Sequence, residues 1–337
     1  MSEAEAWLAS RPVAALAMHP DLAPRLFGAD WRERLGTHVD LIADVLDGTV
    51  PDGADLLDVE VLIACWGCPR LDEHALARMP RLRAVVYAAG SVKGFATDAS
   101  FARGIRVSSE AATNALPVAE YALASILLAG KRVFAISAEY RETREYRPEA
   151  SRRSRWGNNG VRVGIIGASR IGRRVIELLR PFDVEVLLYD PVADDEIAGV
   201  RRAGLAELLA SSDVVSLHAP EMAETRHMID RAGLASMRDG ATLINTARGS
   251  LVEQDALVDE LRSGRLYAVV DVTEPDVLDE DSPLFDVPNL VLTPHIAGSQ
   301  GNELLRLGDE TVRELARFAA GEPFRHDIAP ENVVHLA

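Results

Sequence analysis

The chain has 337 residues, of which 48% are hydrophobic and 26% charged, and its formal net charge is −16. This length exceeds the roughly 100 to 200 residues of one domain and predicts two, while the ordinary apolar content excludes disordered and fibrous classes. The negative charge opposes binding to nucleic acid and to anionic membranes, so we expect small-molecule partners.

The N-terminal residues 1–10 are acidic and contain no apolar run typical of a signal peptide. No later stretch approaches the eighteen or so apolar residues of a membrane span, so we expect a cytoplasmic protein. Only two cysteines occur, Cys65 and Cys68. They are too few for a disulfide framework in a chain of this size and fit a reducing compartment.

In the first part of the chain, apolar runs of strand length alternate with longer amphipathic stretches, at 13–18, 59–64 and 82–87. This alternation predicts βαβ units and a parallel sheet. A long, mostly apolar helical pattern follows at 117–136. The basic, polar stretch 141–159 then breaks the pattern and is predicted to be a domain junction.

A second βαβ series begins after this stretch, and a final amphipathic helix is predicted at 303–320. The short apolar strands of this series would complete one doubly wound sheet. They are expected at 161–166, 184–189, 214–218, 242–245, 268–272 and 290–292.

The second series opens with a strand that runs into a turn marked by Gly167 and Gly172 and then into a helix. In a dinucleotide site such a turn brings backbone N–H groups and a helix N-terminus against the pyrophosphate. The usual middle glycine is replaced by Ser169. Either the loop lies slightly further from the phosphate, or the Ser169 hydroxyl donates a hydrogen bond that compensates for the added side chain. The next strand ends at Asp190, at the distance expected for a ribose-binding acid. Its charge would repel a 2′-phosphate, which favours NAD over NADP.

Three polar groups are expected at the ends of late strands, where doubly wound sheets bind ligands. They are Arg248, the acidic loop 271–276 and His295. An arginine can bind a carboxylate through two parallel hydrogen bonds, a histidine can exchange a proton near neutral pH, and a carboxylate can stabilise the imidazolium. This set suits reduction of a carbonyl beside a carboxylate.

From about residue 82 to 320 the sequence resembles the D-specific 2-hydroxyacid dehydrogenase family, which includes phosphoglycerate, glycerate and formate dehydrogenases. Several separate motifs carry the resemblance: Asn114 with Val118-Ala119-Glu120, Ser216-Leu217-His218-Ala219-Pro220 with Thr225, Asn245-Thr246-Ala247-Arg248-Gly249, and Thr293-Pro294-His295.

The resemblance implies NAD-dependent hydride transfer at C2 of a small 2-hydroxy or 2-oxo acid. Arg248 would bind the substrate carboxylate and polarise its carbonyl, and His295 would be the acid in reduction and the base in oxidation. Backbone N–H groups of Ala89, Gly90 and Ser91 would bind the same carboxylate. The expected cofactor-binding residues are Gly167, Ser169, Arg170, Ile171, Gly172, Asp190, His218, Thr225, Thr246, Ala247, Asp271 and Gly298.

The carboxylate that would pair with His295 is open between two residues. The family's glutamate stands five positions after the aspartate that matches Asp271, which leads to Asp276, one methylene shorter. Glu274 has the usual residue type at the wrong position. Asp276 is taken as the catalytic partner of His295, with Glu274 as the alternative.

The resemblance further implies a Rossmann-like NAD-binding domain at 118–301 and a flavodoxin-like substrate-binding domain at 1–117 and 302–337. A homodimer is expected on the same ground. The identity of the 2-hydroxy acid cannot be predicted, although an uncharged side chain on the substrate is our working hypothesis.

Two other functions compete. The Cys65-Trp66-Gly67-Cys68 motif could carry thiol redox chemistry, although two cysteines at a strand end often have only a packing role. A zinc site would need further ligands that are not nearby, so no metal is expected. Alternatively, some relatives with this fold are NAD-sensing corepressors, and a sensor could retain every catalytic residue.

Overall fold

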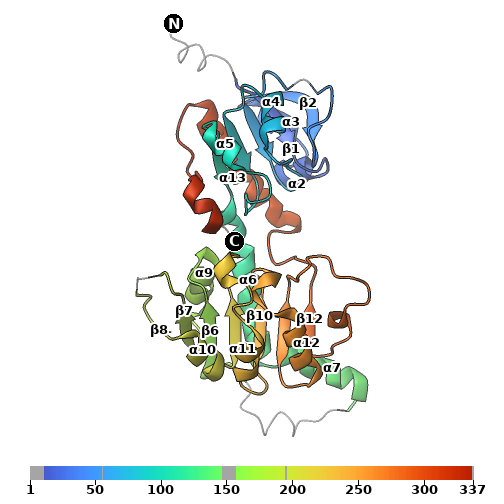
Figure 1. Cartoon of the computed structure of the whole chain (residues 1–337), viewed down its shortest axis with the longest axis vertical. Helices are drawn as coiled ribbons and strands as arrows, with labels where there is room; N and C mark the ends of the chain where they lie inside the picture. Colours follow the sequence, from blue (N-terminus) through green and yellow to red (C-terminus); the bar gives the residue numbers. More distant parts are fainter. Residues whose placement is uncertain (1–10, 55, 146–156, 194–195, 336–337) are drawn as a thin grey trace. The chain divides into compact units, whose positions relative to one another are not determined.

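The computed structural model describes residues 11–54, 56–145, 157–193 and 196–335. The chain divides into two compact units (Figure 1). The first unit contains the residues up to Asn114 together with those from Ser299, and the second is Ala115–Gly298. The N-terminal stretch 1–10 lies outside the described residues. The stretch 141–159 belongs, where it is described, to the second unit, so the prediction of a domain junction there is wrong.

The first unit is built on a five-stranded parallel sheet with the order β2-β1-β3-β4-β5. This order is that of flavodoxin-like folds. Its strands are β1 (Val13–Ala17), β2 (Asp40–Leu46), β3 (Val61–Ala64), β4 (Ala84–Tyr87) and β5 (Arg106–Ser109). Its helices are α2 (Leu22–Phe27), α3 (Trp31–Gly36), α4 (Glu73–Arg78), α5 (Asp98–Ala102) and α13 (Leu304–Ala319), with 3-10 turns η4 (Gly301–Glu303) and η5 (Pro330–His335).

The sequence pattern missed the two edge strands of this sheet, β2 and β5. The strand β2 is mostly exposed or half-buried and carries Asp40 and Asp44, so it lacks a continuous apolar run. The strand β5 is short and its last residues are serines, Ser108 and Ser109. The helix expected at 303–320 is confirmed as α13, which packs on α2 and β4.

The second unit is built on a seven-stranded parallel sheet with the order β12-β11-β10-β9-β6-β7-β8. Counted from β6, this is the Rossmann order with one added strand, which confirms the expected pair of doubly wound α/β domains. Its strands are β6 (Val161–Ile166), β7 (Val184–Tyr189), β8 (Val200–Arg202), β9 (Val214–Leu217), β10 (Thr242–Asn245), β11 (Tyr267–Val270) and β12 (Leu290–Leu292). Its helices are α6 (Ala111–Gly130), whose first turn belongs to the first unit, α7 (Val133–Thr143), α9 (Arg170–Leu179), α10 (Leu205–Ser211), α11 (Arg231–Ser236) and α12 (Gln254–Arg262), with 3-10 turns η1 (Ala223–Thr225), η2 (Gly249–Leu251) and η3 (Pro283–Phe285).

Side chains alternate between two apolar layers, one on each face of this sheet. In β6, Val163 and Ile165 pack with residues of α6 and α9, whereas Ile166 points to the layer that contains residues of α10, α11 and α12. Burial on both faces explains why these strands read as continuous apolar runs. The one strand missed here, β8, is three residues long and exposed.

The helical pattern expected at 117–136 corresponds to two helices. The helix α6 already begins at Ala111 and accommodates Pro117 in its second turn, and Arg132, with φ of 52°, separates α6 from α7. By length and composition α6 is apolar enough to cross a membrane, which corrects the expectation that no stretch comes close. The buried Ala119, Ala122 and Ile126 contribute to the core of the second unit, which accounts for this composition.

Candidate active site

The turn between β6 and α9 requires glycine at two positions. Gly167 has φ of +99°, and a Cβ there would lie 2.6 Å from the backbone nitrogen of Ala219. A Cβ on Gly172 would lie 2.0 Å from the carbonyl oxygen of Gly167. The hydroxyl of Ser169 accepts a hydrogen bond from the Gly172 N–H at 3.3 Å and caps α9. Arg170 and Ile171 form the first turn of α9. The turn therefore combines close backbone approach with a capped helix N-terminus.

Asp190 follows β7 and holds this turn in place. One carboxylate oxygen accepts from the Ala168 N–H at 2.6 Å, and the other accepts from the N–H groups of Val192 and Ala193 at 2.8 and 2.9 Å. Desolvation alone would raise the pKa of Asp190, but the three N–H donors outweigh it and hold the pKa below its ordinary value. A fixed negative charge therefore lies beside the glycine turn.

Two buried polar atoms lie just after the neighbouring strands β9 and β10 without a hydrogen-bond partner among the described residues. They are Nδ1 of His218 and Oγ1 of Thr246. The other ring nitrogen of His218 is hydrogen-bonded to the Ser216 hydroxyl at 2.9 Å. Desolvation lowers the pKa of His218 to about 3, so its ring is neutral and cannot be a proton donor at neutral pH. Because buried polar atoms are normally paired, these two atoms suit contacts with a bound molecule.

Thr225 shapes its own loop. Its hydroxyl donates to the carbonyl oxygen of Pro220 at 2.7 Å and accepts from the Met222 N–H at 2.9 Å. These bonds fold the segment after β9 into the turn η1. The hydroxyl is thus already paired within the loop.

Arg248 follows β10, and its turn is fixed by Asn245. The amide oxygen of Asn245 accepts from the Ala247 N–H at 3.0 Å, and its amide nitrogen donates to the Arg248 carbonyl at 2.8 Å. The guanidinium of Arg248 donates to the Ala247 carbonyl at 2.6 Å. Desolvation lowers the pKa of Arg248, and the nearby carboxylates of Glu221 and Asp276 oppose this. The geometry therefore presents a half-buried cation at the carboxyl edge of the sheet.

The two candidate acids after β11 have different surroundings. The Glu274 carboxylate binds the Arg226 guanidinium through two hydrogen bonds of 2.7 and 3.1 Å and lies 3.7 Å from Nε2 of His227. Its hydrogen bonds with Arg226 hold the pKa of Glu274 below its ordinary value. The Asp276 carboxylate makes no hydrogen bond or ion pair within the described part of the chain and lies near Arg248.

His295 lies on a loop that is held by Asp271. The buried Asp271 carboxylate accepts from the Thr293 hydroxyl at 2.6 Å and from the N–H groups of Ile296 and Ala297 at 2.8 and 2.9 Å. His295 has φ of 54°, and its ring is exposed. Among residues 11–54, 56–145, 157–193 and 196–335, its ring bonds to neither Asp276 nor Glu274. Gly298 ends this loop and is half-buried.

In the first unit, three consecutive backbone N–H groups follow β4. The N–H groups of Ala89, Gly90 and Ser91 make no backbone hydrogen bond in the described ranges. The carbonyl groups of Ala89 and Gly90 instead face the Ser109 hydroxyl, at 3.1 and 2.5 Å. Consecutive free N–H groups form the kind of concavity that binds anions.

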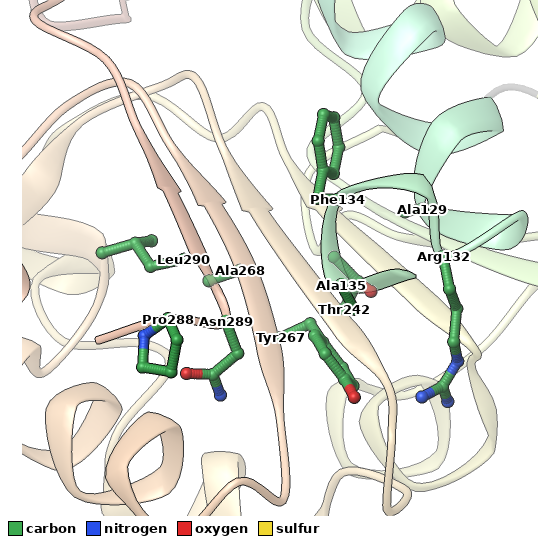
Figure 2. Close-up of a pocket in the computed structure, with 10 residues that line it drawn as sticks. All are labelled: Ala129, Arg132, Phe134, Ala135, Thr242, Tyr267, Ala268, Pro288, Asn289 and Leu290. Carbon is green, nitrogen blue, oxygen red and sulfur yellow. The ribbon is translucent and has the colours of Figure 1, made fainter. Parts of the chain in front are cut away.

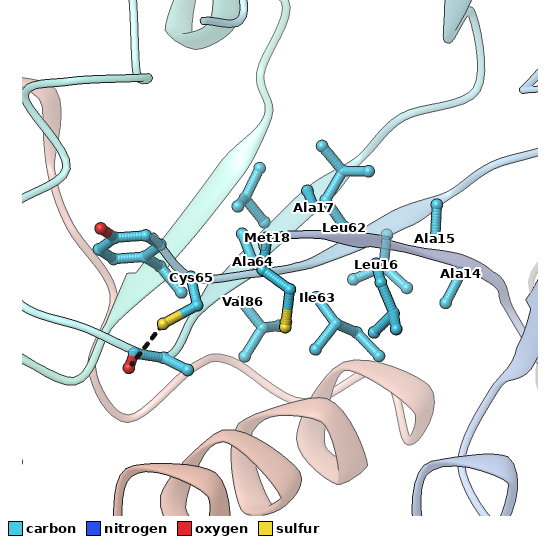
Figure 3. Packing of buried hydrophobic residues seen from close by; sticks show 14 of the residues in the cluster. Ala14, Ala15, Leu16, Ala17, Met18, Leu62, Ile63, Ala64, Cys65 and Val86 are labelled. Carbon is cyan, nitrogen blue, oxygen red and sulfur yellow. Dashed lines mark hydrogen bonds between the residues drawn. The ribbon is translucent and has the colours of Figure 1, made fainter. Parts of the chain in front are cut away.

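The cysteine motif follows β3 in the first unit. The Cys65 thiol is buried in the core and donates to the Ala88 carbonyl at 3.6 Å (Figure 3). Burial raises the pKa of Cys65 to about 12 and also raises the pKa of Cys68 well above its usual range. Thiolates are the reactive form in redox chemistry, so this environment argues against the thiol redox hypothesis.

No sequence pattern singled out Glu221, Arg226 or Ser250. The charge of Glu221 acts on both Arg226 and Arg248. The Ser250 hydroxyl donates to Glu221 at 2.6 Å. Glu221 could have been singled out because it follows Pro220 directly, after a buried strand. Its contact with Ser250, 29 positions further along the chain, could not be predicted from the sequence.

Comparisons with known proteins relate most of the chain to one group. The profile described as "D-isomer specific 2-hydroxyacid dehydrogenase, NAD binding domain" matches residues 123–297. The D-3-phosphoglycerate dehydrogenase of Mycobacterium bovis is 34% identical, over 75% of this chain and 48% of its own length. The chain therefore spans about half the length of the first curated relatives that it matches. The (S)-sulfolactate dehydrogenase of Chromohalobacter salexigens is 36% identical over 74% of this chain and 81% of its own length. A crystal structure of D-lactate dehydrogenase from Aquifex aeolicus, complexed with NAD and lactic acid, has a TM-score of 0.73 and 28% identity, over 92% of this chain and 96% of that one.

Proposed function

The chain belongs to the D-isomer specific 2-hydroxyacid dehydrogenase family. We propose that it is an NAD-dependent oxidoreductase acting at C2 of a small 2-hydroxy or 2-oxo acid. The observation that carries the proposal is the convergence of functional loops on one sheet edge. The loops with Glu221, Arg248, Asp276 and His295 follow the neighbouring strands β9, β10, β11 and β12. The carboxyl edge of a doubly wound sheet is where ligands bind.

The residues around the glycine turn fit NAD. Gly167 and Gly172 leave no room for a Cβ, which is the requirement for close backbone approach to a pyrophosphate. The unpaired Nδ1 of His218 and Oγ1 of Thr246 offer polar contacts to a bound group. Asp190 remains ionised beside this turn and would accept hydrogen bonds from ribose hydroxyls. NAD, when bound, supplies or accepts the hydride.

Arg248 is assigned to the substrate carboxylate. Its planar guanidinium can donate two parallel hydrogen bonds to a carboxylate, and its partial desolvation strengthens this attraction. His295 is assigned to the proton transfer at the C2 oxygen, since its exposed ring is available to a substrate. Ala89, Gly90 and Ser91 would donate N–H groups to the same carboxylate.

Asp276 is assigned as the acid that stabilises the His295 imidazolium. Its carboxylate has no hydrogen bond to any described residue, whereas Glu274 already holds Arg226 through two. Moving Glu274 to His295 would leave Arg226 without that partner. This difference favours Asp276.

A turnover experiment tests the proposal. Purified protein is supplied with NADH and, in turn, glyoxylate, pyruvate, hydroxypyruvate and longer or aromatic 2-oxo acids, and NADH oxidation is followed. We expect turnover with at least one acid and loss of turnover in His295→Asn. Tight NADH binding without turnover of any acid would instead favour an NAD-sensing binding protein.

We also propose a homodimer in which α6 and α7 provide the contact. The α7 helix has no buried side chain, and Leu128, Val133, Ile136 and Tyr140 are exposed apolar or aromatic residues on these two helices. Between α7 and the amino-terminal ends of β10, β11 and β12 lies a pocket lined by Phe134, Ala135 and Tyr267, on the opposite edge from Arg248 (Figure 2). Light scattering should give twice the chain mass, and Ile136→Glu should shift it toward the monomer. A wild-type monomer would refute the proposal.

A further inference from the structure

Glu221 is fixed close to Arg248 by a contact that links two strand-end loops. It lies in the loop after β9, and the Ser250 hydroxyl donates to its carboxylate at 2.6 Å. Ser250 stands two residues after Arg248, in the turn η2. The negative charge of Glu221 is therefore held beside the guanidinium to which we assign the substrate carboxylate.

The charges around Arg248 form an alternating series. Glu274 is bound to Arg226, Glu221 acts on both Arg226 and Arg248, and Asp276 acts on Arg248. Three carboxylates thus interact with two guanidinium groups. With neutral imidazoles at His295 and at His227, which lies 3.7 Å from Glu274, the group carries one net negative charge, and an imidazolium at His295 brings it to neutrality.

This balance has a consequence for the charge of the substrate. One substrate carboxylate can be bound by Arg248 through directional hydrogen bonds. A second anionic group on the same substrate would find no unneutralised cation in this cluster and would be repelled by the fixed carboxylates.

We propose that Glu221 is a specificity-determining residue, which makes the site select 2-oxo acids with one negative charge over those that carry a second carboxylate, a sulfonate or a phosphate. The inference rests on the proposed function and specifies its substrate class. Glu221 acts through its charge, and Ser250 acts as the residue that positions it.

The test compares wild-type protein with Glu221→Gln, which keeps the shape and removes the charge. The value of kcat/KM is measured at low ionic strength for glyoxylate and pyruvate, and for oxaloacetate, 3-sulfopyruvate and 3-phosphohydroxypyruvate. We expect wild type to prefer the singly charged acids. Glu221→Gln should raise the relative kcat/KM of the acids with a second anionic group about threefold to tenfold, mainly through KM.

Salt and matched variants separate a charge effect from a structural one. The gain in Glu221→Gln should shrink in about 0.5 M salt, because salt screens interactions between exposed charges. Glu221→Asp should restore most of the wild-type preference, and Ser250→Ala should show a smaller change in the same direction as Glu221→Gln. Glu224→Gln, an exposed carboxylate in the same loop, should behave as wild type.

The outcomes separate a failure of the role of Glu221 from a failure of the proposed function. Turnover with an unchanged substrate ratio in Glu221→Gln would overturn the role of Glu221 and leave the proposed function intact. A wild-type preference for phosphorylated or sulfonated acids would do the same. Absence of wild-type turnover with every acid would overturn both.

Discussion

The backbone N–H of His295 donates a hydrogen bond to the carbonyl oxygen of Asp271 at 2.8 Å, and the Asp271 side chain holds the residues on both sides of His295. Asp271 is thus a positioning residue for the proposed acid and base, which adds to the cofactor contact expected from the sequence. The Asp271 carboxylate supplies three of the hydrogen bonds that hold this loop, and the Tyr121 hydroxyl adds another to the Thr293 hydroxyl at 3.0 Å.

Asp271→Asn should therefore impair catalysis more than it impairs cofactor binding. An amide cannot accept from all three donors, and the loss of charged hydrogen bonds should cost about 2 kcal/mol of stability and lower kcat at least about tenfold. Steady-state kinetics, thermal unfolding and NADH titration measure these effects. Glu280→Gln, at an exposed position of the loop after β11, is the control. Unchanged kcat in a folded Asp271→Asn variant would contradict the positioning role.

Arg248→Lys should lose most activity. An ammonium cannot reproduce the planar, two-pronged grip on a carboxylate, and the expected loss in kcat/KM is on the order of 100-fold. The change should appear in both KM for the 2-oxo acid and kcat, with NADH affinity nearly unchanged. If the variant turns over like wild type, Arg248 does not bind the substrate.

Asp190 should set the preference for NADH over NADPH. Its depressed pKa keeps it charged, and its carbonyl oxygen accepts from the Arg202 guanidinium at 2.6 Å. Asp190→Ser should narrow the NADH-to-NADPH ratio of kcat/KM at least about tenfold, because the repulsive charge is lost while Arg202 remains. Adding Arg202→Gln should reverse part of this gain. A wild-type preference for NADPH would refute the assignment.

Glu110 should make the stability of the first unit depend on pH. Its side chain is fully buried, one oxygen accepts from the Thr113 hydroxyl at 2.8 Å, and the other has no partner in the described ranges. Burial raises the pKa of Glu110 from 4.5 to about 7. The stability contributed by the protonated form is complete below about pH 4.5 and is lost as pH rises through about 7.

Glu110→Gln mimics the protonated carboxyl and should remove this dependence. Relative to wild type, the variant should gain about 2 to 3 kcal/mol in free energy of unfolding between pH 5 and pH 8. Urea unfolding at a series of pH values measures the difference. Glu33→Gln, at an exposed position of α3, should run parallel to wild type. Parallel curves for Glu110→Gln as well would show that Glu110 does not titrate in this range.

The sequence predicted what depends on local periodicity and missed what depends on distant partners. Buried strands such as β6 and the glycine turn after it are visible because apolar runs and glycines are local signals. The edge strands β2, β5 and β8 are short or polar and leave no such signal. In the site, the residue types at Arg248 and His295 could be singled out, but the pairing of Glu274 with Arg226 joins positions 48 residues apart and needs the fold.

The carboxylate that pairs with His295 should influence the pH dependence of reduction. A neighbouring carboxylate stabilises imidazolium and raises the pKa of the histidine, so the proton needed for reduction remains available to higher pH. Reduction should therefore fall as pH rises and the histidine loses its proton, and removal of the true partner should move this fall to lower pH. Asp276→Asn should cause this shift, and the shift should be smaller if the shorter side chain acts through a water. Glu274→Gln should leave the pH at which reduction falls nearly unchanged, because Glu274 is bound to Arg226.

The measurement is the pH dependence of kcat/KM for the 2-oxo acid. A shift in Glu274→Gln without one in Asp276→Asn would make Glu274 the partner, and it would also require Arg226 to release that carboxylate when substrate binds.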